Sequence, residues 1–255
     1  MASRLCHSLV LHFFMVTFSV LNMKKYFLLF IISCTITSVG FTQSLASFND
    51  HLITSNQVLF VKTPAYNSIY GTMSLYERKN NHNSWKLVDS FAVTVGRSGL
   101  AKDVHANIVF NDTVPVKQEG DGKSPSGIFK LGKVFSYHNV QHLKMPFVQV
   151  DTNFYCVDDV ASSYYNTLIK QDTAKHDFNS FEYMRRKDSL YEYGVWVLYN
   201  SDPVTNGGGS CIFLHVWENE NSPTSGCTAM AEENILKLIH WLDEKKNPVL
   251  LQIVE

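Results

Sequence analysis

Short runs of strand-forming residues, separated by turn formers, constrain the fold of this chain more than any other feature. Residues 58–61, 72–76, 85–88 and 91–95 are such runs, and Asn and Gly residues lie between them. Their length and spacing predict antiparallel β structure, either a sandwich or a barrel. Residues 196–199 and 249–254 read as further strands. Hydrophobic residues make up 45% of the chain, which is enough to fill the core of such a fold.

One strand-like run, residues 211–217, carries candidate chemistry. Its period of two predicts that one face holds Ile212, Leu214 and Val216, which form a core face. The other face holds a mixed set that suits the wall of a cleft: Cys211, Phe213, His215 and Trp217. A further cysteine, Cys227, follows in Thr224-Ser225-Gly226-Cys227. Because a thiol reacts as thiolate and an imidazole is its usual base, His215 and Cys227 are a candidate catalytic pair.

A helix is predicted to start just after Cys227, because apolar residues recur there at helical spacing: Ile235, Leu238, Ile239 and Leu242. A helix N-terminus favours negative charge. Gly226 allows backbone N–H groups to approach a developing oxyanion. We therefore expect a Cys227 thiolate at neutral pH, and fast reaction with alkylating reagents.

These residues resemble a known signature, that of the L,D-transpeptidase catalytic domain (the YkuD-like or ErfK/YbiS-like family). The upstream segments 95–99 and 117–129 are similar to the family's EGDG-x-[ST]-P-x-G-x-[FY] region, here Glu119-Gly120-Asp121-Gly122-Lys123-Ser124-Pro125-Ser126-Gly127-Ile128-Phe129. The resemblance covers residues 57–255. It implies a mainly β domain, an L,D-transpeptidase-like sandwich or barrel with a helix after the catalytic cysteine.

The resemblance also implies a reaction. Cys227 attacks the carbonyl between the L-centre of meso-diaminopimelate and D-alanine in a peptidoglycan tetrapeptide, and His215 accepts and returns the proton. A side-chain amine of a second stem peptide then makes a cross-link, whereas water gives L,D-carboxypeptidase activity. A non-catalytic peptidoglycan-binding domain is the alternative of another class. The expected oxyanion and substrate-binding residues are Gly226, Ser225, Thr224, Trp217, Lys123 and Arg97.

The chain departs from the family pattern at two positions. Ala229 stands where the family usually carries arginine, two residues after the cysteine, and Ser225 stands where histidine is frequent. A guanidinium is a bidentate partner for carboxylates, so its loss leaves the recognition of donor and acceptor open. Arg97 and Lys123 are the candidates to replace it.

Three of the five cysteines, Cys156, Cys211 and Cys227, belong to the predicted domain. A Cys156–Cys211 disulfide would leave Cys227 free, but the sequence does not show how far apart these residues lie. The chain has no CxxC or HxxxH pattern, so we expect no metal and no cofactor.

The N-terminal region predicts export. Lys24 and Lys25 precede the apolar run 26–41, as in a secretory signal peptide. We expect residues 1–42 to be an upstream extension plus signal peptide with Met23 as the start, residues 43–56 to be a tether, and residues 57–255 to be the catalytic domain. The expected location is the periplasm. A lipoprotein anchored at Cys34 and a membrane anchor are alternatives, and either would be the only membrane contact.

Two segments flank the predicted cleft. Residues 170–193 are charged and aromatic, which favours a partly helical insertion. Residues 153–166 read as irregular, and Asp158 and Asp159 within them as solvated turn residues. The net charge of −1 and the scattered Lys and Arg residues argue against a nucleic-acid partner.

Overall fold

The computed structural model describes residues 45–105, 108, 113–171 and 177–255. The predicted signal peptide, with Met23 and Cys34, lies outside them. The chain divides after Ile53 into two units, and within the first the 3-10 helix η1 (Asn49–His51) is described. Everything below concerns the second unit, Thr54–Glu255. No helix in the described ranges is long and apolar enough to cross a membrane.

A ten-stranded sheet forms the body of the domain, in the order β10-β11-β12-β3-β2-β1-β13-β5-β4, with β6 paired to β5. An extra pairing between β10 and β5 closes this path into a ring, so the predicted mainly β class is confirmed. The predicted runs 85–88 and 91–95 are parts of one strand, β3. The strands are β1 (Gln57–Thr63), β2 (Tyr70–Glu77), β3 (Lys86–Thr94), β4 (Leu100–Lys102), β5 (Ser124–Ser136), β6 (Phe147–Gln149), β10 (Tyr193–Val197), β11 (Phe213–Val216), β12 (Thr228–Met230) and β13 (Val249–Val254).

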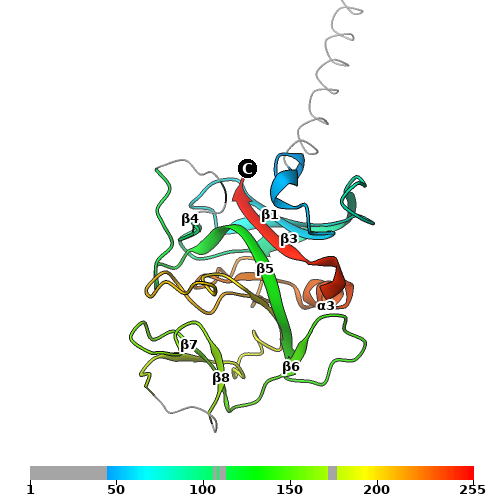
Figure 1. The fold of residues 1–255 in the computed structure, drawn as a ribbon. Helices are drawn as coiled ribbons and strands as arrows, with labels where there is room; N and C mark the ends of the chain where they lie inside the picture. Colours follow the sequence, from blue (N-terminus) through cyan, green and yellow to red (C-terminus); the bar gives the residue numbers. More distant parts are fainter. Residues whose placement is uncertain (1–44, 106–107, 109–112, 172–176) are drawn as a thin grey trace, which may run out of the picture. The chain divides into compact units, whose positions relative to one another are not determined.

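The long strand β5 joins the two halves of the sheet. Its residues 127–130 pair with β13, and its residues 131–136 pair with β10. Figure 1 shows β5 running from the neighbourhood of β13 down toward β6. Strand β10 pairs with β5 on one side and with β11 on the other. Strand β5 therefore supports β11, the strand that carries His215.

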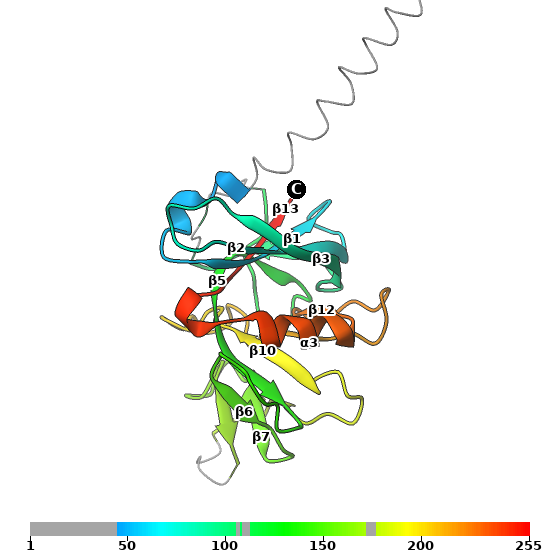
Figure 2. The ribbon, with the colours of Figure 1, turned by 90° about the vertical axis from the view of Figure 1, so that its right-hand side faces the viewer.

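The helix α3 (Glu232–Trp241) covers β10 and β11, and Figure 2 shows it beside β10. It buries Ile235, Leu238 and Ile239, as the helical spacing predicts, and each such burial contributes about 1.5–3 kcal/mol. The helix was expected to start just after Cys227, but it does not. Residues 228–230 form β12 instead, because they pair in parallel with β11, and the helix begins only at Glu232.

A second, three-stranded sheet stands apart from the first. Its order is β8-β7-β9, from β7 (Phe154–Val157), β8 (Leu168–Lys170) and β9 (Phe181–Tyr183). The expected irregular segment at 153–166 is confirmed for residues 158–166 and wrong for residues 154–157, which form β7. The expectation of a partly helical insertion at 170–193 is wrong, because the described residues there contain no helix. The three strands lie within residues 154–183, called the insertion below. They are held together by antiparallel pairing of β7 with both neighbours and by a cluster of buried apolar side chains that includes Tyr155, Ile169 and Phe178.

A disulfide connects the insertion to the main sheet. Cys156 in β7 is bonded to Cys211, just before β11, and their Cα atoms are 6.0 Å apart. The pairing considered from the sequence is thus confirmed. Within the described residues Cys227 is the free cysteine. The bond spans a sequence separation of 55 residues and fixes the insertion next to the strand that carries His215.

We expect the double variant Cys156→Ala/Cys211→Ala to lose about 4 kcal/mol of unfolding free energy, because a cross-link of this span restricts the unfolded chain. Urea unfolding of the oxidised protein and the variant measures the difference. The Cys227→Ala variant, which keeps the disulfide, is the control. An unchanged urea midpoint in the double variant would contradict the expectation.

Candidate active site

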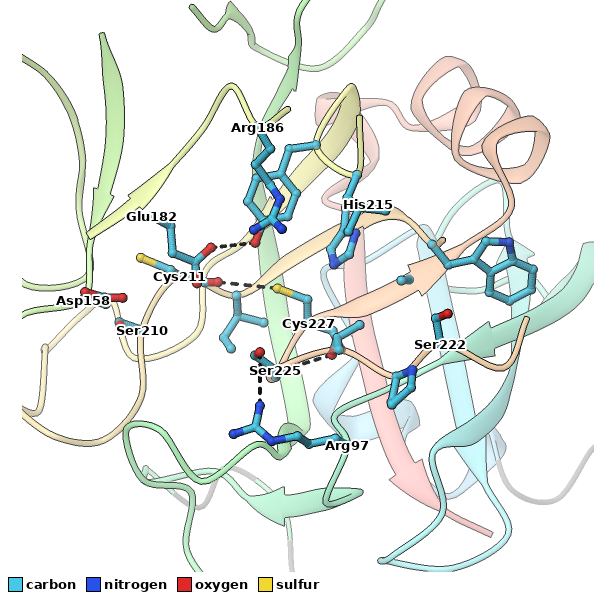
Figure 3. Close-up of a pocket in the computed structure, with 18 of the residues that line it drawn as sticks. Arg97, Asp158, Glu182, Arg186, Ser210, Cys211, His215, Ser222, Ser225 and Cys227 are labelled. Carbon is cyan, nitrogen blue, oxygen red and sulfur yellow. Dashed lines mark hydrogen bonds between the residues drawn. The ribbon is translucent and has the colours of Figure 1, made fainter. Parts of the chain in front are cut away.

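His215 and Cys227 face one solvent-open cavity of about 470 Å³. Its walls come from β11, from the turn 222–227 before β12, from the Glu119 loop and from the insertion (Figure 3). Both side chains are largely shielded, with 6% of each residue exposed. The cavity is therefore the place where a substrate can reach the pair.

Strand register places the two residues on the same face. In the parallel pair, Leu214 lies opposite Thr228, and His215 lies opposite Ala229. Side chains alternate along a strand, so Cys227 faces the same side as Ala229 and His215. The alternation predicted for residues 211–217 is confirmed: Ile212 and Leu214 are in the main core, whereas Cys211, Phe213 and Cys227 share a second apolar cluster.

The main chain fixes the tautomer of His215. Its Nδ1 lies 2.7 Å from the carbonyl oxygen of Val216, which can only accept a hydrogen bond. Nδ1 therefore carries the proton and Nε2 is the basic nitrogen. The edge-to-face contact with the Tyr191 ring, at 5.1 Å between centroids, holds the imidazole in place.

The turn that carries Cys227 is held by hydroxyl groups. Ser124 Oγ and Thr224 Oγ1 both donate to the carbonyl oxygen of Cys227, each at 2.7 Å. The sulfur accepts from the Phe213 amide at 3.3 Å, and the thiol lies 3.6 Å from the Cys211 carbonyl oxygen. The Cys227 thiol is thus held in position before any substrate arrives.

Burial sets the charge state of the pair. It raises the pKa of the Cys227 thiol to about 12, with the Glu182 charge as the next cause. It lowers the pKa of His215 to about 4. The expected thiolate is therefore wrong for the free protein, because no helix starts at Cys227 and desolvation penalises the charged form. The resting pair is a neutral thiol and a neutral imidazole.

We expect the alkylation rate of Cys227 by iodoacetamide to rise about tenfold for each pH unit between about pH 7 and 10, because only the thiolate reacts and its fraction grows below the pKa. Mass spectrometry of quenched samples gives the rate. Free cysteine, with its lower pKa, is the control and levels off within this range. A plateau for Cys227 near pH 8 would mean that its thiolate is already populated.

Most of the predicted substrate-binding residues line the cavity: Arg97, Trp217, Thr224, Ser225 and Gly226. Arg97 donates to Ser225 Oγ at 3.1 Å. Lys123 is the exception. Its Nζ donates to the Ser98 carbonyl oxygen, and it is not part of the described cavity wall, so its expected role is withdrawn.

The expected oxyanion amides are only partly available. The Gly226 N–H donates to Thr224 Oγ1 at 3.1 Å, so it already has an acceptor. It stabilises an oxyanion only if this bond gives way when substrate binds.

The Glu119–Gly122 segment has a structural role in this geometry. Asp121 accepts hydrogen bonds from Lys117 Nζ and from the Lys123 amide, at 2.7 and 2.8 Å. Gly122 has a φ of 70°, and a Cβ there would press on the Arg97 side chain, so glycine is required. The segment thereby holds Arg97 at the cavity.

The sequence reasoning missed several cavity residues as site residues, and four of them bear on the chemistry at Cys227: Asp158, Glu182, Arg186 and Tyr191. All come from the insertion or its flank. Tyr191 packs on His215 and donates from its hydroxyl to Glu182 Oε2 at 2.6 Å. Asp158 is a cavity residue, not a solvated turn residue, whereas Asp159 does accept from the amides of Ala161 and Asn179. The only sequence signal was the charged and aromatic composition of residues 170–193.

A buried histidine on β11 and a buried cysteine directly before the parallel neighbour β12 open to one polar cavity on a mainly β frame. The chain belongs to the YkuD family, because the model of the L,D-transpeptidase catalytic domain matches residues 70–251. It is therefore a transpeptidase-type enzyme, of a family that acts on peptidoglycan stem peptides. Searches of curated proteins and of solved structures gave no match. The described residues hold no cluster of three or more His, Cys, Asp or Glu side chains fit for a metal ion.

Proposed function

We propose that the domain is a peptidoglycan L,D-transpeptidase that uses Cys227 as the nucleophile and His215 as the base. The observation that carries this proposal is the single cavity shared by His215, on β11, and Cys227, directly before the paired strand β12. Family membership supplies the substrate class, the tetrapeptide stem.

The neutral pair defines the first step. The Cys227 sulfur attacks the carbonyl carbon before D-alanine while His215 Nε2 takes the thiol proton, so charge develops only as the bond forms. The Cys227 amide, joined by that of Gly226 once it leaves Thr224, stabilises the oxyanion. His215 then gives its proton to the departing D-alanine amine, which leaves the acyl-enzyme. An incoming amine attacks the thioester carbonyl, and its proton passes through His215 back to the sulfur.

The test is intact-mass analysis of the purified domain mixed with a disaccharide-tetrapeptide. We expect an adduct equal to the substrate minus D-alanine, mapped to Cys227, and a cross-linked dimer as the product. Tripeptide without dimer would indicate the L,D-carboxypeptidase. Absence of both adduct and turnover would contradict the proposal.

A second candidate is a peptidoglycan-binding domain that does not turn over its ligand. The high pKa of Cys227 and the missing guanidinium at Ala229 favour it. In the same experiment it would bind the tetrapeptide without any change in its mass.

Export to the periplasm remains part of the proposal. Its supports are the Met23-Lys24-Lys25 start followed by an apolar run, and the Cys156–Cys211 disulfide, which persists in oxidising compartments. N-terminal sequencing of the mature protein tests it. A mature end within residues 1–22 would contradict it, and a lipid on Cys34 would make the protein a lipoprotein.

A further inference from the structure

The insertion places a carboxylate beside the nucleophile. Glu182, in β9, lines the same cavity as Cys227, and Figure 3 shows it on the side of the cavity opposite Ser222. The Tyr191 hydroxyl donates a hydrogen bond to Glu182 Oε2, at 2.6 Å. The acylation steps described above do not use this hydrogen bond.

Tyr191 connects the carboxylate to the catalytic pair. The residue is 5% exposed and its ring packs on His215, and its hydroxyl, which donates to Glu182, also lowers the pKa of the Cys227 thiol. A phenol has a single proton to donate. Because that proton is shared with Glu182, the hydroxyl stabilises a thiolate on Cys227 only in part.

Charge acts in the same direction as this hydrogen bond. The Glu182 carboxylate raises the pKa of the Cys227 thiol, because like charges in a shielded site disfavour one another. The nearest guanidinium, on Arg186, does not offset it by pairing: its Nε donates to Asp188, at 2.8 and 3.1 Å to the two carboxylate oxygens. The Glu182 charge thus reduces the fraction of Cys227 that is thiolate.

Asp158 supplies an independent sign of a missing ligand. It lines the same cavity wall, and its Oδ1 is shielded from solvent without a hydrogen-bond partner among the described residues. A shielded acceptor without a donor is costly. Burial and the charge of Asp158 raise the pKa of the neighbouring Glu182, so the ionised form of Glu182 needs a cationic partner. A group with several N–H donors and a positive charge matches this wall of the cavity.

We propose that Glu182, with Asp158, recognises a substrate ammonium group, and that its binding releases the Tyr191 hydroxyl to Cys227. Glu182 is then the residue that selects amine-bearing substrates and makes the nucleophile respond to them. On the proposed function, on which this identification of the ligand rests, the group is the side-chain amine of the diamino acid in the stem peptide.

Two substitutions should change the reactivity of Cys227 in opposite directions. Glu182→Gln removes the charge, lowers the pKa of Cys227, and should speed iodoacetamide alkylation at neutral pH on the order of tenfold. Tyr191→Phe keeps the ring on His215 but removes the donor, and should slow it. Glu182→Asp keeps the charge and should stay near the wild-type rate. Glu218→Gln, a carboxylate at the exposed rim of the cavity, is the matched control and should leave the rate unchanged.

A binding measurement tests recognition without turnover. In the Cys227→Ala background, calorimetry compares a disaccharide-tetrapeptide that has a free side-chain amine with the same compound N-acetylated there. We expect the free amine to bind about tenfold tighter or more, and Glu182→Gln to abolish this preference, because a charge-assisted hydrogen bond is lost.

The outcomes separate the two proposals. Acyl-enzyme formation by the wild type with equal affinity for the two peptides would overturn ammonium recognition and leave the transpeptidase assignment standing. No adduct and no binding of either peptide would overturn both. Alkylation of a folded Glu182→Gln variant at the wild-type rate would overturn the control of Cys227 by Glu182, and the melting temperature of each variant establishes that it is folded.

Discussion

Replacing Cys227 by alanine is expected to abolish acyl-enzyme formation and to leave the fold intact. No other thiol in the described residues is free to take its place, because Cys156 and Cys211 are bonded to each other. The change removes one small side-chain atom at the cavity wall and disturbs neither the disulfide nor the hydroxyl contacts to the Cys227 carbonyl. Intact-mass analysis with the tetrapeptide gives the result, and circular dichroism reports the fold.

The matched control for this variant is Ser222→Ala. Ser222 also lines the cavity. Within the described residues, its hydroxyl donates to the exposed side chain of Glu218, at 3.4 Å, and not to the catalytic pair. We expect it to form the adduct at the wild-type rate. Undiminished turnover of muropeptides by Cys227→Ala would end the covalent mechanism.

Replacing His215 by alanine is expected to slow acylation about a hundred- to ten-thousand-fold, the usual contribution of a positioned general base. The effect should be large here because the resting thiol is neutral, with a pKa of about 12, and cannot attack without a proton acceptor. Rapid-quench mass analysis of adduct formation measures the rate. The His240→Ala variant, which changes an exposed histidine on α3, is the control and should keep the wild-type rate.

A change of less than about threefold in His215→Ala would show that another group accepts the proton. Loss of the edge-to-face contact with Tyr191 is the structural side effect to separate from this. His215→Gln fills the space without an equivalent base, so equal losses in the glutamine and alanine variants assign the effect to proton transfer.

Local patterns in the sequence predicted the parts of the fold that depend on one segment. The alternation in residues 211–217 gave the two faces of β11, and the apolar spacing of Ile235, Leu238 and Ile239 gave the buried side of α3. The strand at Val249–Val254 was found in full. In each case the apolar pattern lies within one segment and matches the burial of that segment, so burial and local preference agree.

Parts of the fold that depend on distant pairing could not be predicted in this way. Thr228-Ala229-Met230 lies where a helix start was expected, and only the parallel partner in β11 makes it a strand. The insertion has no regular apolar period, and its strands are set by β7 pairing with two neighbours that lie further along the chain. Tertiary context decides such short strands.

The same distinction applies to the candidate site: residues within one sequence motif were predicted, and residues from distant segments were not. His215, Cys227 and the turn before it were visible as a motif, and so was Arg97. Glu182 and Tyr191 were not, because both lie far from Cys227 in sequence: Glu182 belongs to the separate three-stranded sheet, and Tyr191 lies between β9 and β10. The sign of the Cys227 pKa shift also depends on burial, which no local pattern reports.

The separate three-stranded sheet has a consequence for engineering. It has its own apolar cluster and is attached to the catalytic strand by the Cys156–Cys211 bond, whereas His215 and Cys227 are set by the main sheet. On the two proposals made above, bond-making chemistry and choice of ligand are encoded in different stretches of the chain. Exchanging side chains within β9, with both cysteines retained, offers a route to redirect the domain toward new acyl donors without rebuilding its catalytic pair.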